Sequence, residues 1–335
     1  MKLSLKFIIA GVFSLLILWG GISLGSTGIP FGDTLKALLE RAFSLSLDTE
    51  IRIITIVWNL RFPRVVLAFI VGGALAMSGV VFQSVLRNPL ASPYILGVSS
   101  GASLGAGLVM LTGFAIPLIR SFTLPLAGFI FGLGTVFLVI WCASRLDKSM
   151  SNNTVILFGM VFSLFVNAIL TALTALYREE MRNLLHWQMG SFSMKGWPYS
   201  GLMLPFLLIG IAVLFRYARE MDILSFGEDE ARSMGLDATK LRRLLLACSA
   251  ALTGAAVALC GAIGFVDLIA PHLARRITGS RHRYVLPMAF LVGGSLLVLT
   301  DLIARIVVSP SELPVGAVTA LVGGPFFAWV YFRKR

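Results

Sequence analysis

Long uninterrupted apolar stretches restrict the fold of this chain more than any other feature of its sequence. Apolar residues make up 57% of the 335 residues, charged residues make up 13%, and the mean hydropathy is +0.90. A membrane-spanning helix needs about 20 mostly apolar residues, and only helices or closed barrels satisfy every backbone polar group in lipid. The stretches are too continuous for the alternating strands of a barrel. The sequence therefore predicts an all-α polytopic membrane protein with about ten transmembrane helices, near residues 7–24, 65–85, 95–115, 122–143, 154–176, 200–217, 244–264, 265–274, 285–304 and 314–332.

The basic residues predict the orientation of these helices. If the N-terminus lies inside, 18 of the 28 Lys and Arg residues but only 7 of the 16 acidic residues fall in inside segments. Positive charge gathers on the cytoplasmic side of membrane proteins. We therefore expect a multi-pass protein of the cytoplasmic (inner) membrane with both termini cytoplasmic, and no binding of nucleic acid despite the net charge of +12. A secretory signal peptide is the alternative interpretation of the first apolar run.

The predicted domain organisation is a single transmembrane domain over residues 1–335, with its longest cytoplasmic connection at about 218–243. Residues 72–89 align with 254–271 at an offset of 182 and share six identities. Because the two segments are predicted to run in opposite directions, an inverted repeat of two five-helix halves is possible, as in many transporters. The alternative is that small residues recur wherever membrane helices pack closely.

No motif for catalysis or nucleotide binding is present in the sequence. His186, His272 and His282 are scattered, the three cysteines lack CxxC spacing, and no GxxxxGK[ST] phosphate loop occurs. We therefore expect a chain that is not an enzyme and holds no cofactor or metal. Ionisable residues inside spans mark ion pathways, and only Asp267 and Asp301 stand out here. This scarcity favours a separate ATPase chain over an ion gradient as the source of energy.

Four segments carry further motifs in a fixed order. They are 60–105, GEDEARSMGL at 227–236, GAIGFVDLIAPHLARRITGSRHR at 261–283, and DLIARIVVSPSELPVGAVTALVGGPFF at 301–327. Together they resemble the signature of the FecCD family, the permease subunits of binding-protein-dependent ABC importers for ferric siderophores, haem and cobalamin. The resemblance implies ten helices per subunit and a second permease subunit, identical or related, around a central pathway. It also implies two cytoplasmic ATPase subunits and an extracytoplasmic substrate-binding protein as partners.

Three arginines are predicted to face outward at the ends of spans: Arg61 and Arg64, which flank Pro63, and Arg305. In the family, arginines at matching positions pair with carboxylates on the two lobes of the binding protein. A guanidinium suits this role because it binds a carboxylate through two hydrogen bonds and steers encounter. The alternative is that these side chains snorkel to lipid headgroups.

The centre of the connection at 218–243 resembles the family's coupling element, which seats in the ATPase so that closure of the ATPase dimer moves the membrane helices. Its glycine-bracketed composition predicts a short helix, and Glu228, Ala231 and Gly235 are expected to be buried at that contact. The alternative is a solvated charged loop. The predicted coupling residues are Gly227, Glu228, Asp229, Glu230, Ala231, Arg232, Ser233, Met234 and Gly235.

A possible cytoplasmic gate lies between the fourth and fifth spans, at Asn152 and Asn153. The resemblance is to small hydroxyl residues that form the gate in the cobalamin permease, and the asparagines depart from that pattern. Asparagine can close a pathway by hydrogen bonding across a dimer axis. The alternative is that one of these residues only caps the following helix.

Asp267 is another departure, because the family most often carries glycine there. The topology predicts that this carboxylate lies near the outer end of its helix. It could touch substrate, but we expect it to pair locally, for example with a nearby arginine.

These observations predict the transmembrane permease subunit of an ABC importer that carries a ferric siderophore across the cytoplasmic membrane. ATP hydrolysis would take place in the partner subunits. One alternative keeps the machinery and changes the cargo to cobalamin or haem. Others are an ion-coupled secondary transporter and a structural membrane scaffold.

Overall fold

A computed structural model describes residues 2–25, 27–147 and 151–332, without the side chains of Glu228 and of residues 330–332. The regular structure of this described part is helical. Seven of its helices, among them the continuous helical run Ile51–Val85, are long and apolar enough to cross a membrane. The shorter apolar helices Val98–Thr112 and Val315–Trp329, together with Val266–Thr278, match the three remaining runs. The predicted all-α fold with about ten membrane helices is therefore confirmed.

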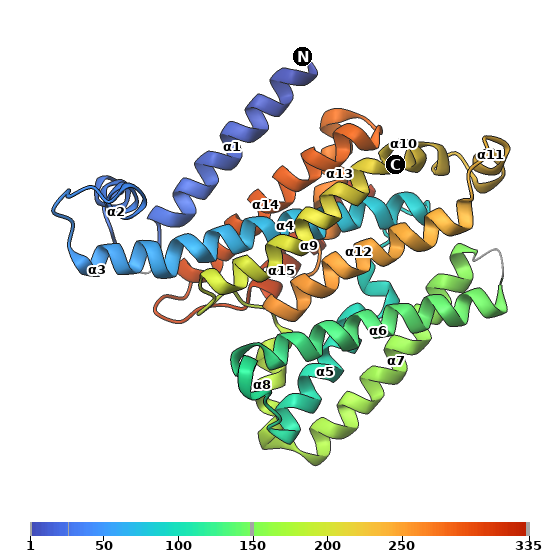
Figure 1. The fold of residues 1–335 in the computed structure, drawn as a ribbon, viewed down its shortest axis with the longest axis horizontal. Coiled ribbons are helices and arrows are strands. Elements are labelled where there is room, and N and C mark those ends of the chain that lie inside the picture. Colours follow the sequence, from blue (N-terminus) through green and yellow to red (C-terminus); the bar gives the residue numbers. More distant parts are fainter. Residues whose placement is uncertain (1, 26, 148–150, 333–335) are drawn as a thin grey trace.

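The long helices form where apolar residues continue for five or more turns, and they end where Pro, Gly or charge interrupts them. Figure 1 places α10 and α11 at one end of the bundle and α3 at the other. Following the predicted topology, we call these the inner and outer ends. The helices are α1 (Leu3–Ser23), α2 (Phe31–Phe43), α3 (Ile51–Ile54), α4 (Phe62–Val85), α5 (Val98–Thr112), α6 (Thr123–Leu146), α7 (Asn152–Leu176), α8 (Arg178–Gln188), α9 (Trp197–Arg216), α10 (Ala218–Leu224), α11 (Glu228–Ser233), α12 (Ala238–Cys260), α13 (Val266–Thr278), α14 (His282–Ile306) and α15 (Val315–Phe332), with a π-helix at Thr55–Arg61 and 3-10 turns at Pro93–Leu96 and Pro117–Phe122.

Corresponding helices of the two halves use corresponding packing partners. Helix α4 packs on α14 as α12 packs on α6, and α5 packs on α6 as α13 packs on α14. Helices α4 and α12, which contain the aligned segments, run in opposite directions (Figure 1). Both features are what an inverted repeat requires.

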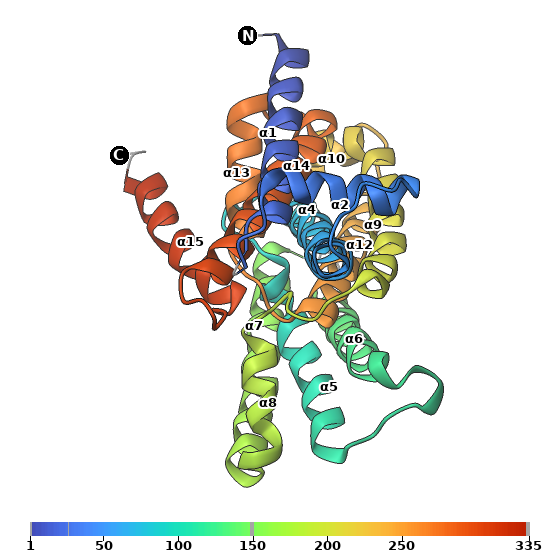
Figure 2. The same cartoon turned by 90° about the vertical axis from the view of Figure 1, so that its left-hand side faces the viewer.

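The core is centred on α4, which is buried along nearly its whole length. Glycines let α14 approach it closely: a Cβ on Gly72 would lie 2.3 Å from the carbonyl oxygen of Gly293. Small residues allow such contact between membrane helices. By contrast, α5, α7 and α8 project from the body formed by α4, α13 and α14 (Figure 2), and α7 leaves much of its surface exposed.

Candidate functional site

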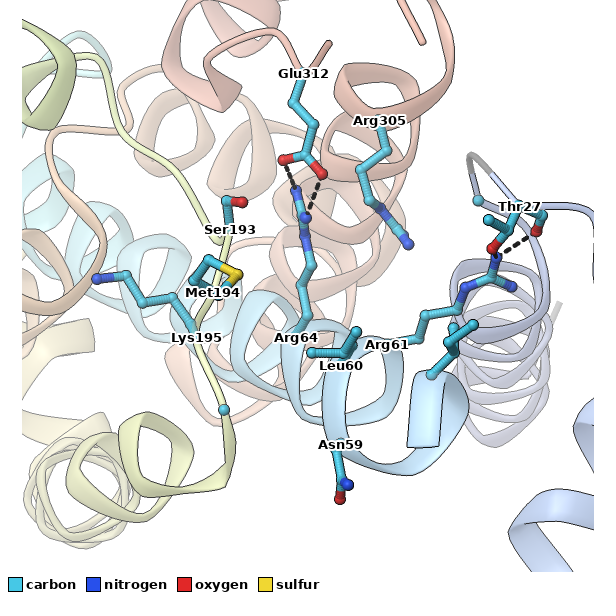
Figure 3. Close-up of a pocket in the computed structure, with 13 residues that line it drawn as sticks. Thr27, Asn59, Leu60, Arg61, Arg64, Ser193, Met194, Lys195, Arg305 and Glu312 are labelled. Carbon is cyan, nitrogen blue, oxygen red and sulfur yellow. Dashed lines mark hydrogen bonds and ion pairs between the residues drawn. The ribbon is translucent and has the colours of Figure 1, made fainter. Parts of the chain in front are cut away.

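The three predicted docking arginines line one pocket of about 420 Å³ at the outer end (Figure 3). Arg61 closes the π-helical turn before α4, Arg64 lies in the first turn of α4, and Arg305 lies in the last turn of α14. The pocket wall also carries Glu312 and Lys195. The structure thus brings together side chains that lie more than 200 residues apart in sequence.

The three guanidinium groups are buried and hold partners within the chain. The exposed fractions of the whole residues are 6% for Arg61, 8% for Arg64 and 5% for Arg305. Arg64 donates to both Asp301 and Glu312. The Nε atom of Arg305 lies 3.1 Å from the Asp301 carboxylate. A cluster of alternating charges therefore joins the outer ends of α4 and α14.

Arg61 is satisfied differently, by the turn that follows α1. Its guanidinium donates to the carbonyl oxygen of Ser23 at 2.6 Å and to the hydroxyl of Thr27 at 2.8 Å. It thereby fixes the end of α1 against the start of α4. Snorkelling to lipid headgroups does not describe these contacts, since all three arginines point into the protein.

Glu312 is the half-exposed member of the cluster, with 35% of its side chain open to solvent. Burial alone would raise the pKa of this carboxyl, but the hydrogen bonds and charge of Arg64, with the charge of Arg305, hold the pKa below its ordinary value. Glu312 is therefore ionised at neutral pH and occupies one side of the Arg64 fork.

The predicted coupling segment forms two short helices at the inner end, α10 and α11. Gly227 joins them with φ of 152°, a conformation that favours glycine. Met221 and Leu224 anchor α10 in the core, whereas Phe226 and Met234 are 75% and 62% exposed. These two apolar side chains are the accessible ones beside α11.

The expectation for individual coupling residues needs correction. Ala231 is buried against this chain's own core, so it is not available to a partner. Gly235 is exposed at the end of the segment with φ of 79°. The side chain of Glu228 lies outside the described residues. Ala231 is buried internally because α11 packs against both α10 and α12 of the same chain.

The predicted gate residues lie in the first turn of α7. Ser151 caps this helix, since its hydroxyl accepts a hydrogen bond from the Thr154 amide. Capping by Asn152 or Asn153 is therefore wrong: both residues lie inside the helix, one and two positions after the N-cap. Asn152 instead donates to the Leu86 carbonyl oxygen at 2.8 Å and so ties α7 to the end of α4. Asn153 is exposed.

Asp267 is fully buried in the first turn of α13. The prediction that Asp267 lies near the outer end is wrong. The chain folds back after α12 and starts α13 deep in the bundle, beside Gly79. The Ser92 hydroxyl donates to its carboxylate. Local pairing thus occurs, but with a hydroxyl instead of an arginine.

Comparison with known proteins identifies the family. The model of the FecCD transport family matches residues 12–333, which is nearly the whole chain. The chain belongs to the FecCD transport family. It is 40% identical over 316 residues to the uncharacterized ABC transporter permease protein YvrB of Bacillus subtilis, covering 94% of this chain and 90% of the relative.

Other FecCD relatives have named cargo. The hemin transport system permease protein HmuU of Yersinia pestis is 38% identical over 285 residues, covering 83% of this chain and 84% of the relative. A solved structure of a metal-chelate type ABC transporter in an inward-facing conformation is 30% identical and has a TM-score of 0.84, covering 99% of this chain and all of that one. This chain is therefore an ABC importer permease, a transport subunit.

Sequence reasoning missed several residues of this FecCD permease. The sequence did not single out Glu312 and Lys195 as pocket residues, because charged residues are common in loops. At the inner end, Asp222, Ser84 and His282 form contacts that no local pattern announces. His282 stood out only as one of three histidines in the sequence.

Proposed function

We propose that this chain is the permease subunit of an importer for a ferric siderophore, and that the cargo is a ferric complex with negative charge. The observation that supports this cargo is a wall on α7 and α8 in which polar and basic side chains lie among leucines. Arg178 and Arg182 line a pocket of about 620 Å³ there with Asn167, Thr171 and Thr174. Polar groups on an exposed face of a membrane helix indicate a water-filled surface instead of lipid.

Charge complementarity gives this wall its selectivity. Neither Arg178 nor Arg182 has a partner among the described residues, and both are exposed. Unpaired guanidinium groups favour carboxylate or catecholate oxygens. The names of relatives include cargo that fits, such as Fe(3+) dicitrate in Escherichia coli. Cobalamin is the alternative cargo for this chain, because relatives include a cobalamin import system permease.

In the proposed assembly, two permease subunits, two cytoplasmic ATPase subunits and an extracytoplasmic binding protein work together. We propose that the binding protein docks at the outer pocket through Arg61, Arg64 and Arg305. Since Glu312 already occupies the Arg64 fork, a carboxylate of the binding protein would replace Glu312 there. Residues 227–235 would seat in the ATPase through Met234, with the neighbouring Phe226 adding a second exposed apolar contact. Asn152 and Asn153 would lie at the inner gate.

Uptake measurements test the cargo. Cells with and without the gene are given ferric complexes of carboxylate, catecholate and hydroxamate chelators, labelled with radioactive iron, and separately labelled haem and labelled cobalamin. We expect loss of uptake for the negatively charged ferric complexes. Arg182→Gln should reduce that uptake, whereas Arg120→Gln, at an exposed position away from the wall, should not. Loss of cobalamin uptake alone would overturn the proposed cargo.

A further inference from the structure

A chain of hydrogen bonds runs through the inner end of the protein and joins four helices. Arg275 of α13 donates to the Ser84 hydroxyl of α4 at 3.1 Å. The Ser84 oxygen lies 2.5 Å from Nε2 of His282 in α14. Nδ1 of His282 lies 2.6 Å from the Asp222 carboxylate of α10. Asp222 also accepts the backbone N–H of His282 at 2.9 Å.

Each group in this run of hydrogen bonds can donate to the next one, from Arg275 to Asp222. Arg275 can only donate, so the Ser84 oxygen accepts and its O–H is free to donate to Nε2 of His282. Nδ1–H of His282 then donates to Asp222, which selects one tautomer of the ring. The chain begins at a cation, ends at an anion, and leaves no member unsatisfied.

This run of hydrogen bonds is buried at its centre and partly exposed at its two ends, Arg275 and Asp222. Ser84 and His282 are buried, and the Asp222 side chain is 33% exposed. Asp222 belongs to α10, which packs on both α4 and α14 and leads directly into α11. A displacement of α10 must therefore either carry the inner ends of α4 and α14 with it or break a charge-assisted hydrogen bond.

We infer that Asp222, His282, Ser84 and Arg275 form a positioning relay that transmits motion of the coupling segment to α4, α13 and α14. This inference rests on the proposed role of residues 227–235 in seating against the ATPase. Apolar contacts hold α10 against the bundle, but because they are not directional they allow α10 to slide along α4 and α14. Hydrogen bonds are directional and weaken steeply with misalignment, so the relay fixes the angle of α10 as well as its distance.

Reconstituted complexes of the permease with its ATPase and binding protein, in vesicles, test this role. The variants are His282→Ala, which interrupts the relay at its centre, and Ser84→Ala, which removes one hydroxyl. Asp237→Asn is the matched control, because Asp237 lies in the same cytoplasmic connection but only caps α12 through the Lys240 amide. Two quantities are measured for assembled complexes: stimulation of ATP hydrolysis by the binding protein, and substrate transported per ATP hydrolysed.

We expect His282→Ala to keep basal ATP hydrolysis but to lower both coupling quantities at least about fivefold, the lower range of usual coupling between sites. Ser84→Ala should lower them in the same direction by a smaller factor, and Asp237→Asn should match the wild type. A structural brace alone would lower the melting temperature and the yield of complex without changing either ratio in the complexes that form. Unchanged ratios in assembled Ser84→Ala and His282→Ala complexes would overturn the relay.

If His282→Ala does not assemble, the ratios of Ser84→Ala decide. Stimulation by the binding protein does not depend on knowing the cargo. A wild-type complex that is stimulated but takes up none of the ferric complexes would contradict the proposed cargo and leave the relay standing. A stimulated wild type with an equally stimulated Ser84→Ala variant would contradict the relay and leave the cargo standing.

Discussion

The two ends of the α4–α14 pair are joined by different chemistry. At the outer end, Arg64 of α4 pairs with Asp301 of α14, and Glu312 and Arg305 complete a cluster of full charges. At the inner end, Ser84 of α4 meets His282 of α14 through a chain of hydrogen bonds with a charge only at each terminus. We call the outer cluster of Arg64, Asp301, Arg305 and Glu312 the outer lock. The hydrogen bonds at the inner end instead reach the coupling segment through Asp222.

This difference shows where the pair can receive a signal. A buried ion cluster is costly to break, because separation leaves charges unpaired in a low-dielectric setting. Between the ends, Gly72 and Gly293 hold the helices in close contact. Helices α4 and α14 are therefore expected to move as one body, driven from the inner end.

The largest expected effect comes from breaking the outer lock. Asp301→Asn removes the charge shared by Arg64 and Arg305 without creating a cavity. It should cost about 3–5 kcal/mol because the buried Arg305 loses its carboxylate partner and Arg64 keeps only Glu312. Thermal denaturation of the purified permease checks this. Asp33→Asn is the control, since the Asp33–Lys36 pair is exposed and is worth at most about 1 kcal/mol. Equal melting temperatures for the two variants would contradict the lock.

A smaller effect is expected from separating the helices at their middle. Gly72→Ala places a methyl group 2.3 Å from the Gly293 carbonyl oxygen, and relief of such overpacking costs about 1–3 kcal/mol. Gly134→Ala in α6 is the matched control, because its added methyl group would meet nothing. The control should be neutral or more stable by up to about 1 kcal/mol. The melting temperatures of both variants measure the contrast.

Loss of the Asp222 charge at the inner end should cost about 1.5 kcal/mol or less, the lower end of the range for a hydrogen bond to a charged group, because solvent screens this partly exposed carboxylate. Burial alone would raise the pKa of Asp222, but hydrogen bonds from His282 lower it below its ordinary value. The stabilisation is therefore complete above the unfolded pKa of about 3.9 and is lost as pH falls through the lower native pKa.

Melting temperatures of wild type and Asp222→Asn between neutral and acidic pH check this behaviour. The difference should shrink as pH falls below about 4, where the carboxyl of the unfolded chain binds protons. A difference that does not shrink below about pH 4 would show that the fold does not stabilise the ionised form of Asp222.

The smallest effect concerns the exposed edge of the outer lock. Glu312→Gln leaves Asp301 in place but removes the carboxylate that competes for Arg64. Binding-protein affinity should therefore rise a few fold, since partly exposed pairs are worth about 0.2–1 kcal/mol. Titration of the complex with its binding protein measures this. Weaker binding would instead place Glu312 itself in the docking contact.

Much of the fold could be predicted from the sequence, but less of the site. The ten apolar runs matched helices because hydrophobic length is a local property, and even the short run at 265–274 appears as α13. The predicted position of Asp267 was wrong. The reversal of the chain before α13 depends on Gly261, which packs against the Trp187 carbonyl and Gly190. Such a contact has no local signature.

The sequence by itself determined the membrane class, the number and order of the spans, and the family resemblance, since each depends on composition and motifs along the chain. It also marked Arg61, Arg64 and Arg305 as one outward group. Only the tertiary structure decided their partners: Arg64 and Asp301 lie 237 positions apart, and Ser84 and His282 lie 198 apart. The physical reason is that the length of each apolar run fixes which residues form a membrane helix. The pairing of charges depends instead on which helix faces meet, and small residues far apart in the chain set that contact.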